Sequence, residues 1–226
     1  SLQSPQSQVG GLGILDPSSG LRYLQVDNPS SLVKNSQPRG IAAARGRIYV
    51  NTAASIRIYQ VDNRKDKPLL KLEKEVILNE WLLGGPMQAN LVPIAASEQR
   101  NRLYVGNNNF CAIDELDLEG SFIGRQHLWE IAPDIFPLPG NSEPTVVYGF
   151  IRNLGVSPTG ILCITVANCN NSGTGKVISL DNGEELIAGL HDPSDGLFEG
   201  NRFFLHDIDQ GTYMETLRPY YANINK

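Results

Sequence analysis

Short runs of alternating apolar and polar residues recur along the whole chain, and turn-forming residues separate one run from the next. At 56–59, for example, Ile56 and Ile58 alternate with Arg57 and Tyr59 in the pattern of a β-strand with one face inward. The Asp-Asn-Gly sequence at 181–183 supplies the positive φ angles that a tight β-hairpin needs. The pattern therefore predicts β-hairpins throughout the chain, with no amphipathic helix between them.

Two kinds of predicted hairpin alternate. Hairpins of the first kind end in small or polar residues, and they occupy 39–52, 90–108, 153–168 and 194–207. Hairpins of the second kind carry Asp or Gly in the turn, and they occupy 11–26, 55–75, 111–126 and 175–190. One hairpin of each kind makes a four-stranded unit, and a repeat of about 40 to 50 residues is typical of β-propeller blades.

The sequence thus predicts an all-β fold, a β-propeller of about five four-stranded blades. The run 211–217 is predicted to be the third strand of a final blade, and we expect the N- and C-terminal strands to close the ring together. The whole chain, 1–226, is predicted to form a single domain with a flexible tail at 1–10. The Pro-rich segment 129–149 is expected to form a long loop over the mouth of the central channel.

Polar residues lead the predicted first strands of the blades, and these strands line the channel of a propeller. The residues are Arg39, Asn90, Asn153 and Asp195. We expect their side chains to meet at one mouth of the channel and to bind a small polar ligand. A second alternative is a divalent metal, Ca²⁺ or Zn²⁺, on Asn90, Asn153 and Asp195, because hard cations prefer oxygen ligands. A third is a water-filled channel in which the same groups are structural.

Two His-Asp pairs lie near the C-terminus, at 191–192 and 206–207. An imidazole beside a carboxylate can act as a general base in lactone or ester hydrolysis, and His206 with Asp207 is the better candidate because it ends an inner hairpin. Adjacent residues on a strand point to opposite faces, so neither pair is a preformed dyad. The alternative is a structural histidine that bonds a neighbouring blade.

Two phrases, "NLGVSPTGILCITV" from 153 and "SDGLFEGNRFFLHD" from 194, resemble the blade starts of the gluconolactonase and regucalcin family. That resemblance implies a six-bladed propeller that binds a divalent metal on its axis and opens lactones, with Asn90, Asn153 and Asp195 as ligands by position. The family's fourth ligand, a Glu, has no equivalent here.

From about 90 to 217 the chain also resembles an uncharacterised bacterial propeller-like family, through Phe110, Cys111 and Asn153. This second resemblance implies a fold and no activity. The segment 167–177 is similar to the strand connections of NHL-type propellers.

Composition narrows the range of partners. The net charge of the 226 residues is -5, and no Lys/Arg stripe of the kind that displaces phosphate counterions is present, so we expect no nucleic-acid partner. Apolar runs such as 161–167 are far shorter than the roughly 20 residues that span a bilayer, so a soluble protein without a membrane span is expected. The given chain has no signal peptide pattern, and the compartment stays open. Cys111, Cys163 and Cys169 lack C-x-x-C spacing and are predicted to be core thiols.

The functional hypothesis from the sequence is a propeller that binds a small polar ligand or a partner at its channel mouth. The alternatives are a metal-assisted hydrolase or lactonase of the gluconolactonase type and a protein-interaction scaffold. A Ser-His-Asp hydrolase is not supported, because the sequence lacks a Gly-x-Ser-x-Gly elbow.

Overall fold

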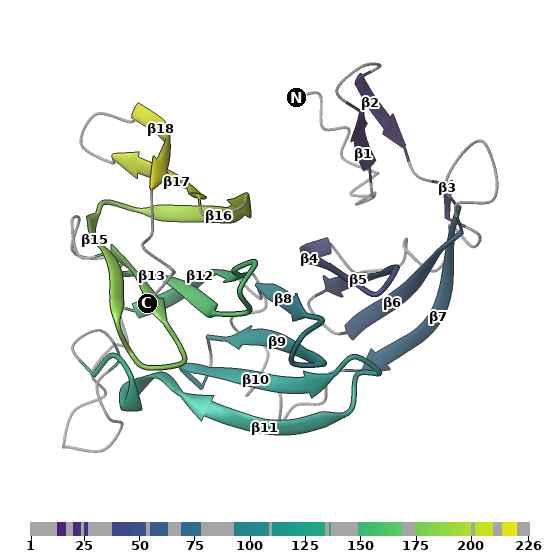
Figure 1. The fold of residues 1–226 in the computed structure, drawn as a ribbon, viewed down its shortest axis with the longest axis horizontal. Helices are drawn as coiled ribbons and strands as arrows, with labels where there is room; N and C mark the ends of the chain where they lie inside the picture. Colours follow the sequence, from purple (N-terminus) through teal and green to yellow (C-terminus); the bar gives the residue numbers. More distant parts are fainter. Residues whose placement is uncertain are drawn as a thin grey trace, which may run out of the picture. The chain divides into compact units, whose positions relative to one another are not determined.

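The structure is a computed structural model, and Figure 1 shows its strands in chain order. It describes residues 13–16, 20–23, 25–26, 38–52, 55–62, 69–77, 93–108, 110–133, 136, 149–168, 175–199, 202–209 and 214–220. The predicted tail at 1–10 and most of the predicted loop at 129–149 lie outside these residues.

Nearly every described segment is a β-strand, and no α-helix occurs among the described residues. The strands pair in five sheets. Apart from the short β3, each strand pairs antiparallel with a strand that is its neighbour in the chain, which is the pattern within a propeller blade. The predicted all-β fold of propeller blades is therefore confirmed. The described sheets have two, three, four, four and five strands, and the number of blades stays a prediction.

The chain divides into two compact units, unit 1 at Ser1–Asn79 and unit 2 at Glu80–Lys226. The organisation of the whole chain as a single domain stays a prediction.

Unit 1 contains one two-stranded sheet and one five-stranded sheet. Its strands are β1 (Gly13–Asp16), β2 (Gly20–Tyr23), β3 (Gln25–Val26), β4 (Pro38–Ala44), β5 (Arg47–Thr52), β6 (Ser55–Asp62) and β7 (Leu69–Ile77). The hairpins predicted at 39–52 and 55–75 form the β4-to-β7 meander, whose core includes the buried Val50, Tyr59 and Leu70. One detail differs from the prediction. The last residues of the segment 11–26 form β3, which pairs in parallel with β7 and not with the β1–β2 hairpin.

Unit 2 contains three successive sheets. The first has β8 (Ile94–Ser97), β9 (Arg102–Asn107), β10 (Ala112–Asp117) and β11 (Phe122–His127); the second has β12 (Gly149–Val156), β13 (Leu162–Asn168), β14 (Gly175–Ser179) and β15 (Glu185–Leu190); the third has β16 (Pro193–Glu199), β17 (Arg202–Asp209) and β18 (Met214–Tyr220). These are the predicted hairpins in the predicted order. The third strand expected at 211–217 is present as β18, while closure of the ring by both chain ends stays a prediction.

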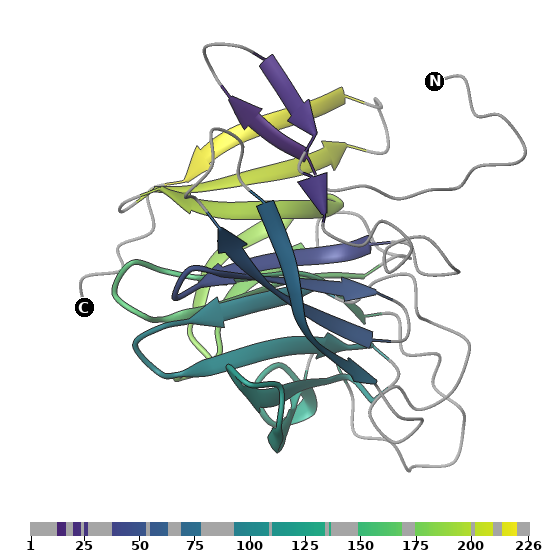
Figure 2. The same ribbon diagram turned by 90° about the vertical axis from the view of Figure 1, so that its right-hand side faces the viewer.

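The first strands of these three sheets lie next to one another. β12 contacts β8 of the sheet before it and β16 of the sheet after it. In both Figure 1 and Figure 2 the teal, green and yellow sheets of unit 2 follow one another in chain order. Neighbouring first strands are expected when blades are arranged around a common axis, so unit 2 has the local arrangement of a propeller.

Two hairpin turns confirm the turn chemistry predicted from the sequence. Gly120 and Gly183 have φ angles of 83° and 71°, in the left-handed region that favours glycine. In the first of these turns Asp117 also accepts hydrogen bonds at Oδ1 from the backbone N–H groups of Glu119 (3.0 Å) and Ser121 (2.7 Å). The Asp therefore stabilises the turn that the Gly makes sterically possible.

The largest core of unit 2 lies between its first two sheets, and it includes a connector from the segment after β11. Tyr104 and Ile113 of the first sheet belong to the same buried cluster as Ile151 and Ile164 of the second. A 3₁₀-helix at Leu128–Glu130 and the residues after it place the side chains of Leu128, Ala132 and Phe136 in this cluster. Ala132 and Phe136, from the first part of the predicted loop 129–149, thus belong to this core. Most of that segment lies outside the described residues, and a loop over the channel mouth stays a prediction.

Candidate functional site

Three first strands have an irregular pairing in their first half, and a charged residue stands at each irregularity. In β4 the extra residue is Arg39, and in β12 it is Arg152. In β16 the pairing shifts between Pro193 and Gly196, and Asp195 directly precedes the re-paired Gly196. A β-bulge re-aims the side chains around it and is frequent beside functional sites. The bulges therefore make the first half of these strands a candidate site.

The bulge in β12 changes which residue of that strand corresponds to Arg39 of β4 and Asp195 of β16. The sequence pattern placed Asn153 in line with Arg39 and Asp195, whereas the strand pairing places Arg152 there, one residue earlier. β12 begins at Gly149, ahead of the predicted start, and its bulge adds one residue that an alternating pattern does not reveal. Sequence reasoning therefore missed Arg152, although an arginine directly before the predicted site residue was visible.

Arg152 and Asn153 are consecutive, yet both side chains reach the beginning of the next sheet. Arg152 Nη2 donates to Asp192 Oδ1 at 2.7 Å, and the two side chains retain 18% and 20% of their exposed surface. Asn153 Nδ2 donates to the backbone carbonyl of Gly196 at 2.6 Å. Two successive residues of a regular strand would point to opposite faces, so the bulge explains this shared direction.

Asp207, one member of the predicted catalytic pair, has a structural role directly before β16. Asp207 is 4% exposed, and its carboxylate accepts hydrogen bonds from the backbone N–H of His191 (3.0 and 3.3 Å) and of Asp192 (3.0 Å). These bonds offset the cost of burying the charge and hold the chain that carries Asp192. His206 is half-buried on the same strand, and a catalytic role for His206 and Asp207 stays a prediction.

A further side chain joins the first two sheets at the same end. Asn108 Oδ1 accepts the backbone N–H of Ile151 at 2.7 Å, and Asn108 Nδ2 donates to the carbonyl of Ile151 at 3.2 Å. The amide thus bonds β12 just before the bulge, as a neighbouring strand would. We call this end of unit 2 the polar end; it comprises Asn108, Arg152, Asn153, Asp192 and Asp207.

A buried ion pair lies within the first sheet. Asp114 is 1% exposed, and it accepts hydrogen bonds from Arg125 Nε at 2.6 Å, from Arg125 Nη2 at 3.1 Å and from Asn107 Nδ2 at 2.9 Å. The Arg125 guanidinium also lies over the Phe110 ring, 4.1 Å from its centroid. Through these bonds the pair links β9, β10 and β11.

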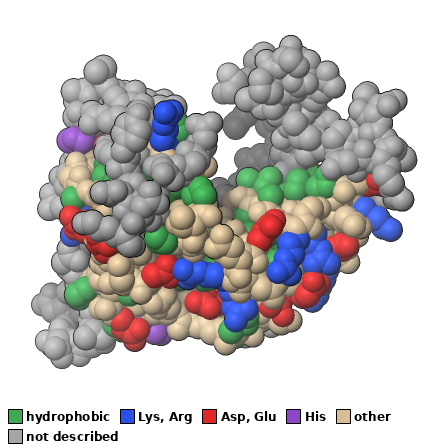
Figure 3. All heavy atoms as spheres, in the orientation of Figure 1, with side chains coloured by type: hydrophobic (Ala, Val, Ile, Leu, Met, Phe, Trp, Pro, Cys, Tyr) green, Lys and Arg blue, Asp and Glu red, His purple; other side chains and the backbone are tan. Residues whose placement is uncertain are grey.

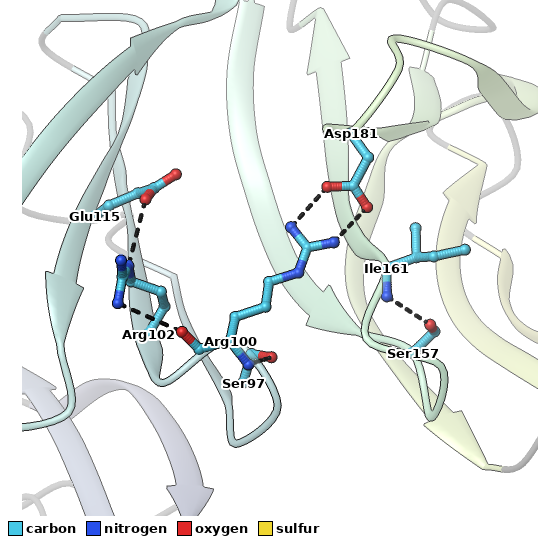
Figure 4. Close-up of polar contacts among 7 residues, drawn as sticks. All are labelled: Ser97, Arg100, Arg102, Glu115, Ser157, Ile161 and Asp181. Carbon is cyan, nitrogen blue, oxygen red and sulfur yellow. Dashed lines mark hydrogen bonds and ion pairs between the residues drawn. The ribbon is translucent and has the colours of Figure 1, made fainter.

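The opposite end of unit 2, which holds the β8–β9 and β14–β15 turns, has an ion pair between two sheets. Figure 4 shows Arg100, in the β8–β9 turn, reaching Asp181 in the β14–β15 turn. Arg100 Nη1 donates to Asp181 Oδ1 at 2.6 Å, and Nη2 donates to Oδ2 at 2.7 Å. The hydrogen bonds to Asp181 raise the pKa of Arg100 above its usual value. We call this end the hairpin end; its bidentate ion pair joins the first two sheets.

The other predicted site residues are located only in part. Asn90 lies outside the described residues. Arg39 and Asp195 are placed on their strands, and their side chains lie outside the description. The meeting of all four predicted residues at one mouth therefore stays a prediction.

Of the three predicted metal ligands, only Asn153 has a described side chain. The amide of Asn153 is already oriented by its bond to the Gly196 carbonyl, and its Oδ1 oxygen is not used in that bond. One amide oxygen does not make a metal centre. Within the described part of the chain there is also no group of three or more His, Cys, Asp or Glu side chains that would hold a metal ion. No chemical step is assigned to a metal on this basis.

Two of the three cysteines are confirmed as core thiols. Cys111 and Cys163 are buried and not in disulfides. Burial raises the pKa of Cys111 and raises the pKa of Cys163 to about 12, so both are protonated near neutral pH. A protonated buried thiol is a poor nucleophile. Cys169 lies outside the described residues.

Unit 1 has a polar contact of its own. Ser55 Oγ donates to Glu75 Oε1 at 2.7 Å, and Arg57 Nε donates to the same oxygen at 2.9 Å. These two hydrogen bonds lower the pKa of Glu75. The contact links β6 to β7 and involves none of the predicted site residues.

The described surface carries charges of both signs. On the face shown in Figure 3, acidic and basic side chains are interspersed, with no large field of one sign. Across the described residues, no helix is both long and apolar enough to cross a membrane.

The strand pairing and the neighbouring first strands define an all-β protein built of propeller-type blades. No protein-family model matches the chain. No curated protein matches its sequence either.

Solved structures that are similar in fold include propellers. A protein of unknown function from Bacteroides caccae has a TM-score of 0.49 and 14% identity over 96% of this chain and 71% of its own. A protein from Lactobacillus plantarum has a TM-score of 0.47 and 17% identity over 91% of this chain and 60% of its own. The WD40 β-propeller domain of Doa1 has a TM-score of 0.44 and 12% identity over 84% of this chain and 53% of its own.

The chain thus spans 60% of the Lactobacillus protein and 53% of the Doa1 chain. At these identities no activity is carried over from them. The assignment of propeller-type blades rests on the strand pairing and on the neighbouring first strands of unit 2.

Proposed function

We propose that this protein is a binding module that holds a small polar ligand at the polar end of unit 2. The observation that carries the proposal is the ion pair of Arg152 and Asp192, placed by a bulge at the beginning of one first strand and directly before the next. The two side chains are 18% and 20% exposed, so the ion pair lies at the surface of unit 2.

The polar end is also held in place, which favours binding over a merely solvated loop. Asp207 bonds the backbone at His191 and Asp192, and Asn153 bonds the backbone of Gly196. Polar groups that are already held when a ligand arrives lose little conformational entropy on binding.

The proposal is tested by thermal shift with a library of small polar compounds, followed by ligand-observed NMR of the hits. A ligand that binds only the folded state raises the unfolding midpoint, by an amount equivalent to about 2.7 kcal/mol at a hundredfold excess over its Kd. We expect Arg152→Gln to abolish the shift produced by a hit. The matched control is Arg102→Gln. Arg102 pairs with Glu115, with 3.8 Å between Nε and Oε2, and this pair is not part of the polar end.

Retention of the full shift in Arg152→Gln, or loss of it in Arg102→Gln as well, would argue against binding at the polar end. Absence of any hit across the library would remove the proposal.

The hydrolase alternative predicted from the sequence uses Asn90, Asn153 and Asp195 as metal ligands with His206 nearby. It is tested in the same series by adding Ca²⁺, Zn²⁺ and EDTA, and by assaying lactone opening. A metal-dependent shift that Asn153→Ala removes would favour the hydrolase over the binding module. A scaffold role through the blade rims is the remaining alternative, and no described contact favours it.

A further inference from the structure

The turn between β14 and β15 holds the only Asn-Gly sequence of the chain, at Asn182 and Gly183. Asparagine is one of the thermolabile residues of proteins, because the backbone nitrogen of the next residue can attack its side-chain carbonyl carbon. Glycine obstructs this attack least, since it has no Cβ. Asn182 is exposed and Gly183 is half-buried, so water also has access to the turn. These features distinguish Asn182 from the other asparagines of the chain.

A neighbouring residue contacts both ends of the Asn182 side-chain amide. The backbone N–H of Glu184 donates to Asn182 Oδ1 at 3.0 Å, and Asn182 Nδ2 donates to Glu184 Oε2 at 3.3 Å. Together these bonds orient the amide. The first bond also stabilises the negative charge that develops on Oδ1 when a nucleophile attacks the carbonyl carbon. The contacts of the amide within the turn therefore favour such an attack.

The backbone hydrogen bonds of the turn oppose the same reaction. The N–H of Gly183 donates to the carbonyl of Ser179 at 2.9 Å, and the N–H of Ser179 donates to the carbonyl of Glu184 at 2.9 Å. The Gly183 nitrogen has to leave Ser179 before it reaches Asn182 Cγ, so the turn has to open. When opening and closing are fast, the population of the open turn sets the rate of such a reaction.

The ion pair at the hairpin end holds this turn to the first sheet of unit 2. Asp181 directly precedes Asn182, and its carboxylate accepts hydrogen bonds from Arg100 at 2.6 and 2.7 Å (Figure 4). An opening of the turn that moves Asp181 costs this contact, so the ion pair favours the closed turn. The contact between two sheets therefore determines how often the labile amide is open to attack.

We propose that Asn182 deamidates spontaneously and that the ion pair of Arg100 and Asp181 controls the rate. In the open turn the Gly183 nitrogen forms a bond to Asn182 Cγ, the bond between Cγ and Nδ2 breaks, and ammonia leaves with the proton that the Gly183 nitrogen gives up. Water then hydrolyses the resulting cyclic imide at either carbonyl, which leaves aspartate or isoaspartate in place of Asn182. No oxidant or reductant is needed. The site lies at the hairpin end, so the inference goes beyond the function proposed for the polar end.

The isoaspartate product should in turn release the ion pair. It adds one backbone carbon between Asn182 and Gly183. The bond of Gly183 to Ser179 and the position of Asp181 opposite Arg100 then no longer fit one backbone. The first two sheets of unit 2 are therefore expected to lose their contact at the hairpin end as the protein ages.

The rate is measured on the full chain, incubated near neutral pH and analysed at intervals by peptide mapping and mass spectrometry. We expect Asn182 to deamidate faster than any other asparagine of the chain. Arg100→Ala should increase the rate at Asn182 about two- to fivefold, which corresponds to the loss of a coupling of about 0.5–1 kcal/mol. Arg47→Ala is the matched control, because it removes an ion pair with Glu73 in unit 1, where Nε and Oε2 are 2.8 Å apart. It should leave the rate unchanged.

Salt provides a test that needs no substitution. At ~1 M salt, where the screening length is about 3 Å, the unmodified protein should deamidate at a rate that approaches that of Arg100→Ala. The rate of the variant itself should change little with salt. Arg100→Lys keeps the charge and loses the planar fork, so it should give an intermediate rate.

Three results would overturn parts of the inference. Faster deamidation at another asparagine would mean that Asn182 is not the site. An unchanged rate in Arg100→Ala, or an equal increase in Arg47→Ala, would mean that the ion pair does not control it. The purified isoaspartate form should show the same salt dependence of its unfolding midpoint as Arg100→Ala, and a form that keeps the salt dependence of the unmodified protein would still hold the ion pair.

Discussion

At the scale of single residues, a few buried polar groups determine how the first strands of unit 2 are arranged. Asp207 bonds two backbone N–H groups ahead of β16, and Asn153 bonds the carbonyl of Gly196 within it. Each of these bonds satisfies a group that burial would otherwise leave unpaired, at a cost of about 1–3 kcal/mol. Small side chains make such contacts possible, since β12 and β16 must approach closely.

Gly196 is the clearest case of close approach. An added Cβ there would collide with the ring of Phe203, with Cε2 at 3.0 Å and Cε1 at 3.1 Å and Cζ nearer still. Phe203 is buried and packs against Phe198, so its ring has little room to move. We expect Gly196→Ala to lower the free energy of unfolding by about 1–3 kcal/mol, as overpacking does, measured by urea denaturation.

The matched control is Gly124→Ala in β11, where an added Cβ meets nothing within 4 Å. It should change stability by no more than about 0.5 kcal/mol. Equal effects of the two substitutions would contradict the close packing at Gly196.

At the scale of elements, neighbouring sheets of unit 2 are joined by polar contacts at both of their ends. The polar end uses side chains that bond backbone groups, as Asn108 does on β12, together with the ion pair of Arg152 and Asp192, whose side chains are 18% and 20% exposed. The hairpin end uses the ion pair of Arg100 and Asp181, whose side chains are 37% and 34% exposed. Salt screens an exposed ion pair more than a partly buried one. The pair of Arg100 and Asp181 should therefore be the more sensitive of the two to ionic strength.

A double-mutant cycle with Arg100→Ala and Asp181→Ala measures the coupling at the hairpin end. We expect a coupling energy of about 0.5–1 kcal/mol at low salt, the range of well-aligned exposed pairs, and a smaller value at ~1 M salt, where the screening length is about 3 Å. The same cycle on Arg102 and Glu115, 3.8 Å apart, serves as the comparison and should give a value near zero. A coupling that salt leaves unchanged would mean that the first pair does not act electrostatically.

At the scale of the whole molecule, the segment after β11 does more than connect two sheets, because it also forms part of the core. Its Leu128, Ala132 and Phe136 are buried in the core between the first two sheets of unit 2. That core also holds side chains from β9, β10, β12 and β13, so the connector stabilises contacts between blades and not within one blade.

Phe136→Ala should therefore destabilise unit 2 by about 3–5 kcal/mol, since it removes a fully buried aromatic side chain and leaves a cavity. Phe122→Ala is the control, because Phe122 lies on β11 and is 42% exposed. It should cost no more than about 0.5 kcal/mol in urea denaturation. A small effect at Phe136 would show that the connector packs loosely.

By itself the sequence was sufficient for the order of the hairpins, because alternation of apolar residues and the Asp and Gly of the turns act locally. The turns at Gly120 and Gly183 and the final strand β18 were predicted in this way. The same local information identified the first strands as the place to look for a site.

Only the tertiary structure decided which residues make that place. The bulge in β12 depends on its pairing with β13, and with it both Arg152 and Asn153 reach the beginning of the next sheet. The contact of Arg152 with Asp192 and the bond of Asp207 to the backbone join residues 40 and 15 or 16 positions apart. Partners so distant in the chain are chosen by how blades pack, which no local pattern of hydrophobic and polar positions encodes.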